Sequence, residues 1–528
     1  MPALVAIAAI AAALVAAGAG CDASSRGARP RRDPGALVVA QAADVLALDL
    51  ARVTDNESIE VCGLLFEGLV RWKPGTTDTE AGLATAWEVS PDGKRWTFHL
   101  RPGVQFHDGA VLDAEAVVFS FARLLDPHHP NYLAEGASYW RGQLKVVTDV
   151  VAVDPATVAI HVARPYAPLL GDLALFPIVS PRAVARWGDD FKQHPVGTGP
   201  FAFASWTPGE QVVVRRFDGY WGKPALLDKV VFRVVVDARQ RLVDLESGSV
   251  DLAKAILPDE QSFVALHPDL ELHHTQGNDV SYLAFNVARA PFDRLAVRRA
   301  INKGINKEPI VKLAYQGRAA PADGPLPPTQ WGYHKPRMQY AFDAAAAKRE
   351  LAAQKLDPAT VYKFYAPSTP RPYMAQPERV ARFLQAALDQ IGVRTDLVLQ
   401  PYTEHRASVQ RGEHDLALFG WIGDTGDPDN FLYVLFHSDN TVEGKAQNIS
   451  FYRDETLDKL LVDAQGTADV PARTAMYGVV QDRIADMAPW VPVAHSEPVV
   501  AGRTELRDVV LSPLGHPVYA LIRRREAP

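Results

Sequence analysis

Alternating strand-like and helical segments in residues 360–421 constrain the fold of this chain more than any other feature. Three runs rich in β-branched, aromatic and other apolar residues are typical of strands. Between the first two, apolar residues recur at helical spacing, and Gly392 follows as a stop signal. The predicted segments are strand 360–366, helix 380–391, strand 393–400, helix 403–411 and strand 415–421. This β-α-β-α-β order predicts a parallel sheet with right-handed crossovers.

Two charged residues follow strands of this predicted unit. Arg371 comes after the first strand, and Asp424 comes after the third, in the loop WIGDTGDPDNFLY at 421–433. Ligands of parallel sheets bind beyond the carboxyl ends of the strands, so we expect both side chains at one binding edge. Together they would suit a molecule with a charge at each end. The alternatives are local: Arg371 pairing with Glu378 on the surface, and Asp424 forming the turn that its neighbours Thr and Gly suggest.

The same loop contains two further acids, Asp427 and Asp429, on either side of Pro428. We interpret them as structural, because aspartate side chains cap local turns. The order of the acids hints at a calcium loop, but the Gly and the distal Glu of an EF-hand are misplaced. The sequence motifs HExxH and GxSxG are absent as well. We therefore expect no metal, no cofactor and no catalytic residues.

Composition limits the classes of protein that this chain can belong to. Its 528 residues, 48% of them apolar, can bury a large core and predict two or more domains. The formal net charge is −7, and dense runs of Lys and Arg occur only at 29–32 and 523–525. We therefore expect no nucleic-acid partner.

An apolar stretch over 3–19 marks the N-terminus and ends in GAGC at 18–21. At roughly 17 residues it is short for a membrane span and suits the core of a signal peptide. The small residues that close on Cys21 resemble a bacterial lipobox, which implies a signal peptide over 1–20, lipidation of Cys21 and a flexible tether over 21–36. Ordinary secretion without lipid is the alternative, and an uncleaved anchor is a weaker one.

If Cys21 carries lipid, the second cysteine, Cys62, has no intramolecular partner. It lies in the apolar segment VCGLLF, so we expect a buried and inert thiol. The surrounding sequence lacks the electropositive setting that a reactive thiol needs.

The N-terminal half is predicted to be rich in strands with interspersed helices. The expected elements are a hairpin over 82–101 with its turn at PDGK, a strand over 104–109, a helix capped by Asp113, strands over 146–153 and 157–162, and a structural turn at the Gly-rich segment 196–201. A phosphate-binding loop would need Lys and Ser or Thr after its second Gly, whereas Pro200 follows here.

Sequence motifs spread over most of the chain match one known family. They are WEVSPDGKRWTFHLRPGVQFHDG at 87–109, DAEAVVFSF at 113–121, GTGPF at 197–201, FDGYWG at 217–222, YLAFN at 282–286, FDRLAVRRAIN at 292–302 and PPTQWGY at 327–333. Together they resemble the peptide-type (family 5) solute-binding proteins of bacterial ABC importers. RPY at 371–373 and the loop at 420–431 are similar to the dipeptide-binding branch in particular.

This resemblance implies an α/β, two-lobed periplasmic-binding-protein fold of the class II type (cluster C), with an extra subdomain in the first lobe. The lobes are expected to close on a ligand like a clam shell. The expected boundaries are 37–285 for lobe I, with the subdomain at about 66–195, then 286–493 for lobe II and 494–528 for the return to lobe I.

The resemblance also implies roles for individual residues. In the dipeptide branch an Arg binds the peptide carboxylate and an Asp binds its ammonium, which by motif position are Arg371 and Asp424. Trp421 and Tyr373 are expected as walls of the side-chain pockets, although aromatic residues beside strands are usually core. The segment around Thr54 should line the pocket but matches the family poorly. The branch carries a disulfide after the Asp-rich loop, a region without Cys in this chain.

The function implied is an exported, non-enzymatic binding protein that delivers dipeptides or similar short peptides to the membrane subunits of an ABC permease. We expect a monomer, periplasmic or at the cell surface, held to the membrane by its lipid. One alternative is the same fold with another solute, such as haem, a metal chelate, glutathione or an opine-like compound. A distant alternative is an extracytoplasmic hydrolase such as a peptidase.

Overall fold

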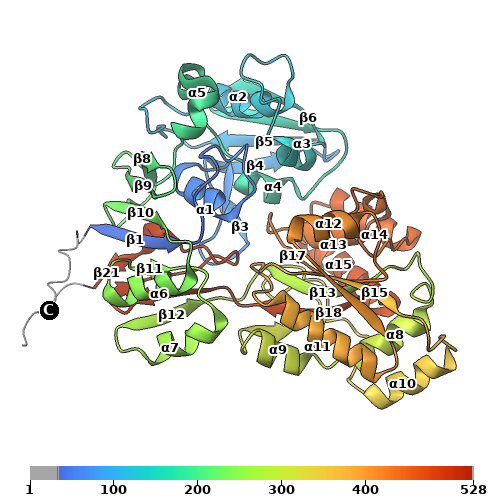
Figure 1. The fold of residues 1–528 in the computed structure, drawn as a ribbon. Helices are drawn as coiled ribbons and strands as arrows, with labels where there is room; N and C mark the ends of the chain where they lie inside the picture. Colours follow the sequence, from blue (N-terminus) through green and yellow to red (C-terminus); the bar gives the residue numbers. More distant parts are fainter. Residues whose placement is uncertain (1–32, 34, 526–528) are drawn as a thin grey trace, which may run out of the picture.

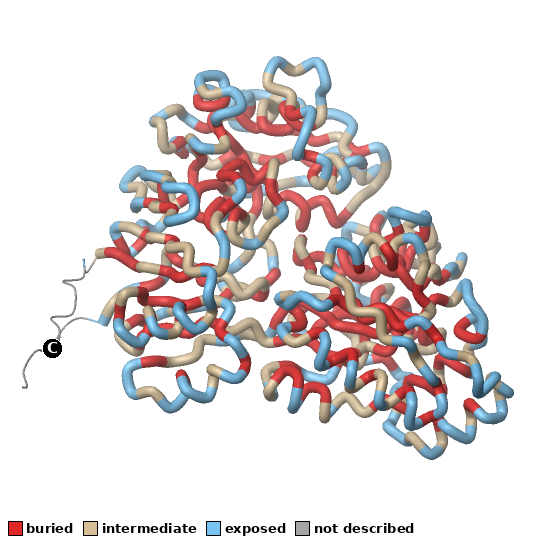
Figure 2. The backbone as a smooth tube through the Cα atoms, in the orientation of Figure 1, coloured by how far each residue is buried: buried red, intermediate tan, exposed pale blue. Residues whose placement is uncertain are grey.

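The computed structural model describes residue 33 and residues 35–525. The expected signal peptide, Cys21 and almost all of the tether lie outside the described residues. Figure 1 shows three bodies, built around a seven-stranded, a four-stranded and a six-stranded sheet. Figure 2 shows buried residues through the interior of each body and exposed segments mostly on its outside. Within the described range, every helix is too short or too polar to cross a membrane.

The first body combines three distant parts of the chain. Its central strand, β1, is almost entirely buried and pairs in parallel with β10 and β11. In sheet order the strands are β12 (Leu270–His274), β19 (Val499–Arg503), β11 (Leu252–Ala253), β1 (Ala36–Gln41), β10 (Lys229–Val234), β9 (Gln211–Arg216) and β8 (Phe201–Thr207). The helices of this region are α1 (Asn56–Leu65), η1 (Gly188–Gln193), α6 (Ala238–Ser247), η2 (Pro258–Glu260) and α7 (Gln261–Leu266), and the C-terminal segment adds β20 (Leu506–Arg507), η4 (Tyr519–Leu521) and β21 (Arg523–Arg524).

Two sequence predictions for this body are confirmed. Cys62, on α1, is buried and unbonded, and burial raises the pKa of its thiol well above the usual value. The Gly-rich segment forms a turn against the end of α1. A Cβ on Gly197 would lie 2.1 Å from the carbonyl oxygen of Leu65, so the backbones touch where only glycine fits.

The second body is an antiparallel sheet covered by helices. Its four strands are, in sheet order, β4 (Ala84–Val89), β5 (Arg95–Leu100), β7 (Thr157–Val162) and β6 (Val147–Asp154). A small ribbon of β2 (Val70–Trp72) and β3 (Thr79–Ala81) joins this region, whose helices are α2 (Ala114–Leu125), α3 (Ser138–Gln143), α4 (Leu169–Leu175) and α5 (Pro181–Trp187). The predicted hairpin, the strand pair and the capping of α2 by Asp113 are confirmed.

The strand predicted over 104–109 is wrong. An isolated bridge between Gln105 and Val111 closes a tight loop, and no longer ladder forms there. Val104 and Phe106 are fully buried. Their alternation therefore serves the core rather than a sheet, and a period of two alone does not distinguish these cases.

The third body carries a mixed six-stranded sheet. In sheet order its strands are β14 (Ala319–Pro321), β18 (Trp490–Ser496), β13 (Asp279–Phe285), β17 (Leu416–Ile422), β15 (Tyr362–Pro367) and β16 (Thr395–Gln400). Its helices are α8 (Leu295–Gly304), α9 (Lys307–Ala314), α10 (Ala344–Ala353), α11 (Pro377–Gln390), α12 (Tyr402–Gln410), α13 (Asp429–Phe436), η3 (Ser438–Thr441), α14 (Glu455–Gly466) and α15 (Val470–Met487).

The predicted β-α-β-α-β unit is confirmed within this sheet. Strand β15 pairs in parallel with both β16 and β17. Helix α11 begins at Pro377, three residues earlier than its apolar spacing indicates, because proline suits the first position of a helix.

The chain crosses between the first and third bodies twice. Strand β12 belongs to the first sheet and β13 to the third, so the first crossing lies at 275–278, before the expected boundary at 285. The return lies at 497–498, between β18 and β19, rather than at 493. The exact lobe and subdomain boundaries, and the closure of the lobes on a ligand, stay predictions.

Candidate ligand-binding site

Three strand ends of the third sheet bring the candidate binding residues to one edge. Arg371 follows β15, Tyr402 follows β16 and Asp424 follows β17. These strands are parallel neighbours in the order β17-β15-β16, so their carboxyl ends share one edge. The predicted placement of Arg371 and Asp424 on a common sheet edge thus follows from the observed strand order.

Arg371 is a half-buried cation that the fold leaves without a carboxylate partner in the described part of the chain. Its guanidinium carbon lies 3.8 Å from the ring centroid of Tyr402, and its Nε is buried with no hydrogen-bond acceptor there. The surface alternative is wrong, because Glu378 pairs with Arg382 at 2.6 Å. Stacking on Tyr402 orients the guanidinium while its remaining N–H groups stay available to a ligand.

Asp424 is the matching anion. Its carboxylate accepts a hydrogen bond from the Tyr139 hydroxyl at 3.4 Å and has no cationic partner among the residues described. Burial raises the pKa of Asp424 to about 6, against the opposing effect of the Tyr139 hydrogen bond. The alternative that the Asp424 side chain holds the turn does not match the contacts. The side chain of Asn430 holds this part of the loop instead, since its amide oxygen accepts from the Asp424 N–H at 3.2 Å.

The second body meets this loop from the other side. Tyr139 belongs to α3 of that body, and a Cβ on Gly171 of α4 would lie 2.7 Å from the Thr425 carbonyl oxygen. Further along, the Ala167 N–H donates to the Gln465 carbonyl at 2.7 Å. In Figure 1, α4 accordingly lies between the β4–β5 sheet and the third body. Asp424 therefore sits where the two bodies touch.

The other two acids of the loop are structural, as interpreted from the sequence. Asp427 is buried and receives two hydrogen bonds from the Arg473 guanidinium, at 2.8 and 2.9 Å. It also caps the following turn by accepting from the Asp429 N–H at 3.0 Å. Asp429 accepts from Gln465 at 2.8 Å, and burial, with Asp427 nearby, raises its pKa to about 7.

Two of the predicted pocket residues lie beside the charged pair. The indole N–H of half-buried Trp421 donates to Asn430 at 2.9 Å, so one amide oxygen holds both Trp421 and Asp424. Tyr373 is 3% exposed, and its ring packs so closely on Gly420 that a Cβ there would lie 2.3 Å away. Its hydroxyl is buried, which raises its pKa, and the neighbouring Arg371 guanidinium opposes this rise.

Thr54 is exposed on the first body, one residue before Asp55, which caps α1. Within the described residues, Thr54 forms no hydrogen bond with Arg371 or Asp424, so its ligand role stays a prediction. The same holds for the ligand roles of Arg371, Asp424, Trp421 and Tyr373.

Sequence reasoning missed three residues that shape this site. Tyr402 directly follows a predicted strand, so the rule that selected Arg371 would also have found it. Asn430 lies in the singled-out loop but gave no separate signal. Tyr139 is 285 positions from Asp424, and no local pattern indicates that contact.

This arrangement offers an unpaired cation and an unpaired anion on one sheet edge of an α/β protein, with the anion where two bodies touch. It suits the architecture of a solute-binding protein. Within the described range, no group of three or more His, Cys, Asp and Glu side chains is placed to hold a metal ion. His437, which follows the Asp-rich loop and α13, is buried and stacked on Tyr433 with ring centroids 4.3 Å apart.

Comparison with known proteins identifies the family. A match to the family described as "Bacterial extracellular solute-binding proteins, family 5 Middle" covers residues 78–443. The chain is 34% identical over 468 residues to the dipeptide-binding protein of Escherichia coli K12, which covers 85% of this chain and 87% of that protein. It is 32% identical over 472 residues to heme-binding protein A of Haemophilus influenzae, with 86% of each covered.

Solved structures agree. The ABC transporter-associated periplasmic binding protein DppA from Helicobacter pylori, in complex with peptide STSA, aligns with a TM-score of 0.78 and 32% identity over 93% of this chain and 98% of that chain. This chain belongs to the bacterial extracellular solute-binding proteins of family 5. The expected family and fold class are thereby confirmed.

Proposed function

We propose that this chain captures dipeptides or similar short peptides between its bodies and delivers them to an ABC permease. The observation that carries the proposal is the pair of unpaired opposite charges, Arg371 and Asp424, on neighbouring strand ends of one sheet edge. The relatives named for dipeptide binding and for a peptide complex support the same solute class.

The chemistry of the two side chains matches the two ends of a peptide. The guanidinium of Arg371 offers a planar fork to a carboxylate, and Asp424 offers an oxygen to an ammonium. An extended dipeptide spans roughly 7 Å at most, so the two loops must come that close around the ligand. Backbone groups would then satisfy the peptide unit while side chains occupy wider pockets. Binding should therefore tolerate many sequences but be strict about length.

The N-terminal region extends this proposal to location. A signal peptide over 1–20 and lipid on Cys21 would hold a monomeric binding protein at the outer side of a membrane, beside its permease. Mass spectrometry of the mature N-terminus tests this part. A diacylated N-terminal Cys21 is expected, and an unmodified N-terminus elsewhere would favour ordinary secretion.

Two measurements test the solute. Mass spectrometry of small molecules released from protein purified in its native state should find short peptides, whereas a porphyrin, metal chelate, glutathione or opine would support the alternative solutes. Calorimetric titration should then show tight binding of free dipeptides and weak binding of their N-acetylated forms. Equal binding of both would argue against an ammonium bound by Asp424. Peptides recovered uncleaved after incubation would exclude the hydrolase alternative.

A further inference from the structure

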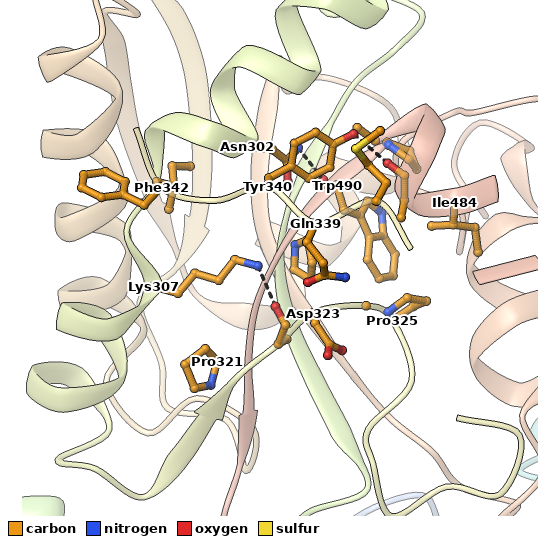
Figure 3. A pocket seen from close by; sticks show the side chains of 18 of the residues that line it. Asn302, Lys307, Pro321, Asp323, Pro325, Gln339, Tyr340, Phe342, Ile484 and Trp490 are labelled. Atoms are coloured by element: carbon orange, nitrogen blue, oxygen red, sulfur yellow. Dashed lines mark hydrogen bonds between the residues drawn. The ribbon is translucent and has the colours of Figure 1, made fainter. Parts of the chain in front are cut away.

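A second pocket lies beside strands β14 and β18 (Figure 3). The sheet edge that carries Arg371 and Asp424, here called the peptide edge, is formed by β17, β15 and β16. Asp279, at the start of β13, pairs with Ile422 beside the peptide edge, whereas Trp490, which lines the pocket, pairs with Ala284. Trp490 thus lies five residues of strand, or roughly 17 Å, from Asp279. Strands β14 and β18 also lie on the opposite side of β13 from β17, β15 and β16. The pocket has a volume of about 220 Å³. It is therefore a separate cavity.

Two opposite charges line this cavity without forming a direct ion pair with each other. The ammonium of Lys307, at the start of α9, donates to the Ala322 carbonyl at 2.6 Å, as the dashed line in Figure 3 marks. Asp323 accepts from the Tyr333 hydroxyl at 2.9 Å. Neither forms an ion pair among the described residues. Burial lowers the pKa of Lys307 to about 8, so it remains a cation at neutral pH with N–H groups to spare.

The rest of the wall is largely apolar. The larger lining side chains are Met338, Tyr340, Phe342, Ile484 and Trp490. The Tyr340 hydroxyl is already bound to the Ala485 carbonyl at 2.8 Å. Trp490 stacks on Tyr282 with ring centroids 3.5 Å apart, and its buried N–H has no acceptor in the part of the chain described. Because that N–H is itself covered, the wall presents mainly apolar surface to a ligand.

We propose that this pocket binds a single α-amino acid with an apolar side chain. Its carboxylate would lie on Lys307, its ammonium on Asp323 and its side chain against the aromatic wall. A simple carboxylate or a simple amine fits less well, because each would leave the opposite charge of the pocket uncompensated. Exposed Glu308 at the same cavity adds negative charge and disfavours a plain anion further.

Nuclear magnetic resonance of the indole N–H groups tests this site in the purified chain, with L-leucine as the probe. The signal of Trp490 is assigned by its absence in Trp490→Phe. Leucine is expected to shift that signal saturably. Lys307→Met and Asp323→Asn should each weaken the affinity about tenfold or more. Lys312→Met, an exposed position on the same helix, should leave it unchanged. Leucine lacking either charge, as 4-methylpentanoate or 3-methylbutylamine, should bind far more weakly.

Several outcomes would overturn the proposal. The first is the absence of a saturable shift of the Trp490 signal. The second is a shift that survives Lys307→Met but disappears in Arg371→Ala. The third is binding of 4-methylpentanoate as tight as that of leucine. The second outcome would place leucine at the peptide edge instead. Lys307→Arg keeps the charge and should retain part of the affinity, which separates loss of the site from loss of folding. Because the pocket shares no lining residue with the peptide edge, failure here leaves the peptide proposal intact.

Discussion

Two sets of arginine and aspartate in the third body differ in whether the fold compensates their charges. Arg473 and Asp427 are both buried and joined by two hydrogen bonds, so each charge is compensated by the fold itself. Arg371 and Asp424 lie on neighbouring strand ends, and the described part of the chain compensates neither. Removing charges from water without pairing them opposes folding. The comparison indicates that the candidate binding residues are those whose charges have no oppositely charged partner within the described part of the protein.

The largest expected effect is on the compensated pair. Arg473→Ala would leave Asp427 as an uncompensated charge beside buried Asp429, and breaking a buried pair typically costs about 3–5 kcal/mol. Urea unfolding should report this loss, while Arg406→Ala, an exposed position on α12, should change little. A cost within the range of a surface ion pair, about 1 kcal/mol or less, would remove the contrast between the two sets.

Substitutions of the uncompensated residues, Arg371 and Asp424, should lower the ligand affinity rather than the free energy of unfolding. Arg371→Ala is expected to weaken dipeptide binding by about 2–5 kcal/mol, because the peptide carboxylate would be stranded in the closed site. The unfolding free energy should stay nearly constant, since Arg371 has no carboxylate partner to lose in the described residues. Calorimetry and thermal unfolding measure the two quantities. Arg379→Ala, exposed on α11, is the matched control. Equal losses of stability and affinity would make Arg371 a structural residue.

Two amide substitutions three residues apart sharpen the comparison further. Asp424→Asn should weaken binding by about 1–3 kcal/mol, less than Arg371→Ala, because an amide oxygen still accepts from the ammonium. Asp427→Asn should lower the unfolding free energy by a similar amount and leave the affinity nearly unchanged. Thermal unfolding and titration of both variants provide the readout. If Asp427→Asn abolishes binding while Asp424→Asn leaves it intact, the assigned anion must move by three residues.

The smallest effect concerns pH. Burial raises the pKa of unliganded Asp424 to about 6, and an ammonium binds its ionised form. Affinity should therefore be highest above pH 6 and fall by up to about tenfold per unit below it, since one pKa unit corresponds to about 1.4 kcal/mol. Calorimetry across this range measures the slope. Asp424→Asn should flatten it, and a slope that persists in this variant would assign the titration to another group, such as Asp429.

Local periodicity carried much of the fold prediction. The segments of 360–421 agree with the observed elements within two residues, apart from the start of helix α11, because spacing and stop signals depend on neighbours in sequence. The prediction failed at 104–109, where buried Val104 and Phe106 alternate in a loop. The same alternation suits a strand and a packed turn, so only tertiary contacts distinguish them.

For the site, the sequence by itself determined that Arg371 and Asp424 follow strands of one parallel unit, because strand direction fixes which ends meet. Only the tertiary structure decided which of these charges have an oppositely charged partner and which do not. Asp427 finds Arg473 46 positions away, and Asp424 meets Tyr139 from another body. Glu378 takes Arg382 rather than Arg371. Local pattern places a residue at the end of an element, whereas its partner depends on how distant elements pack, and packing leaves no period in the sequence.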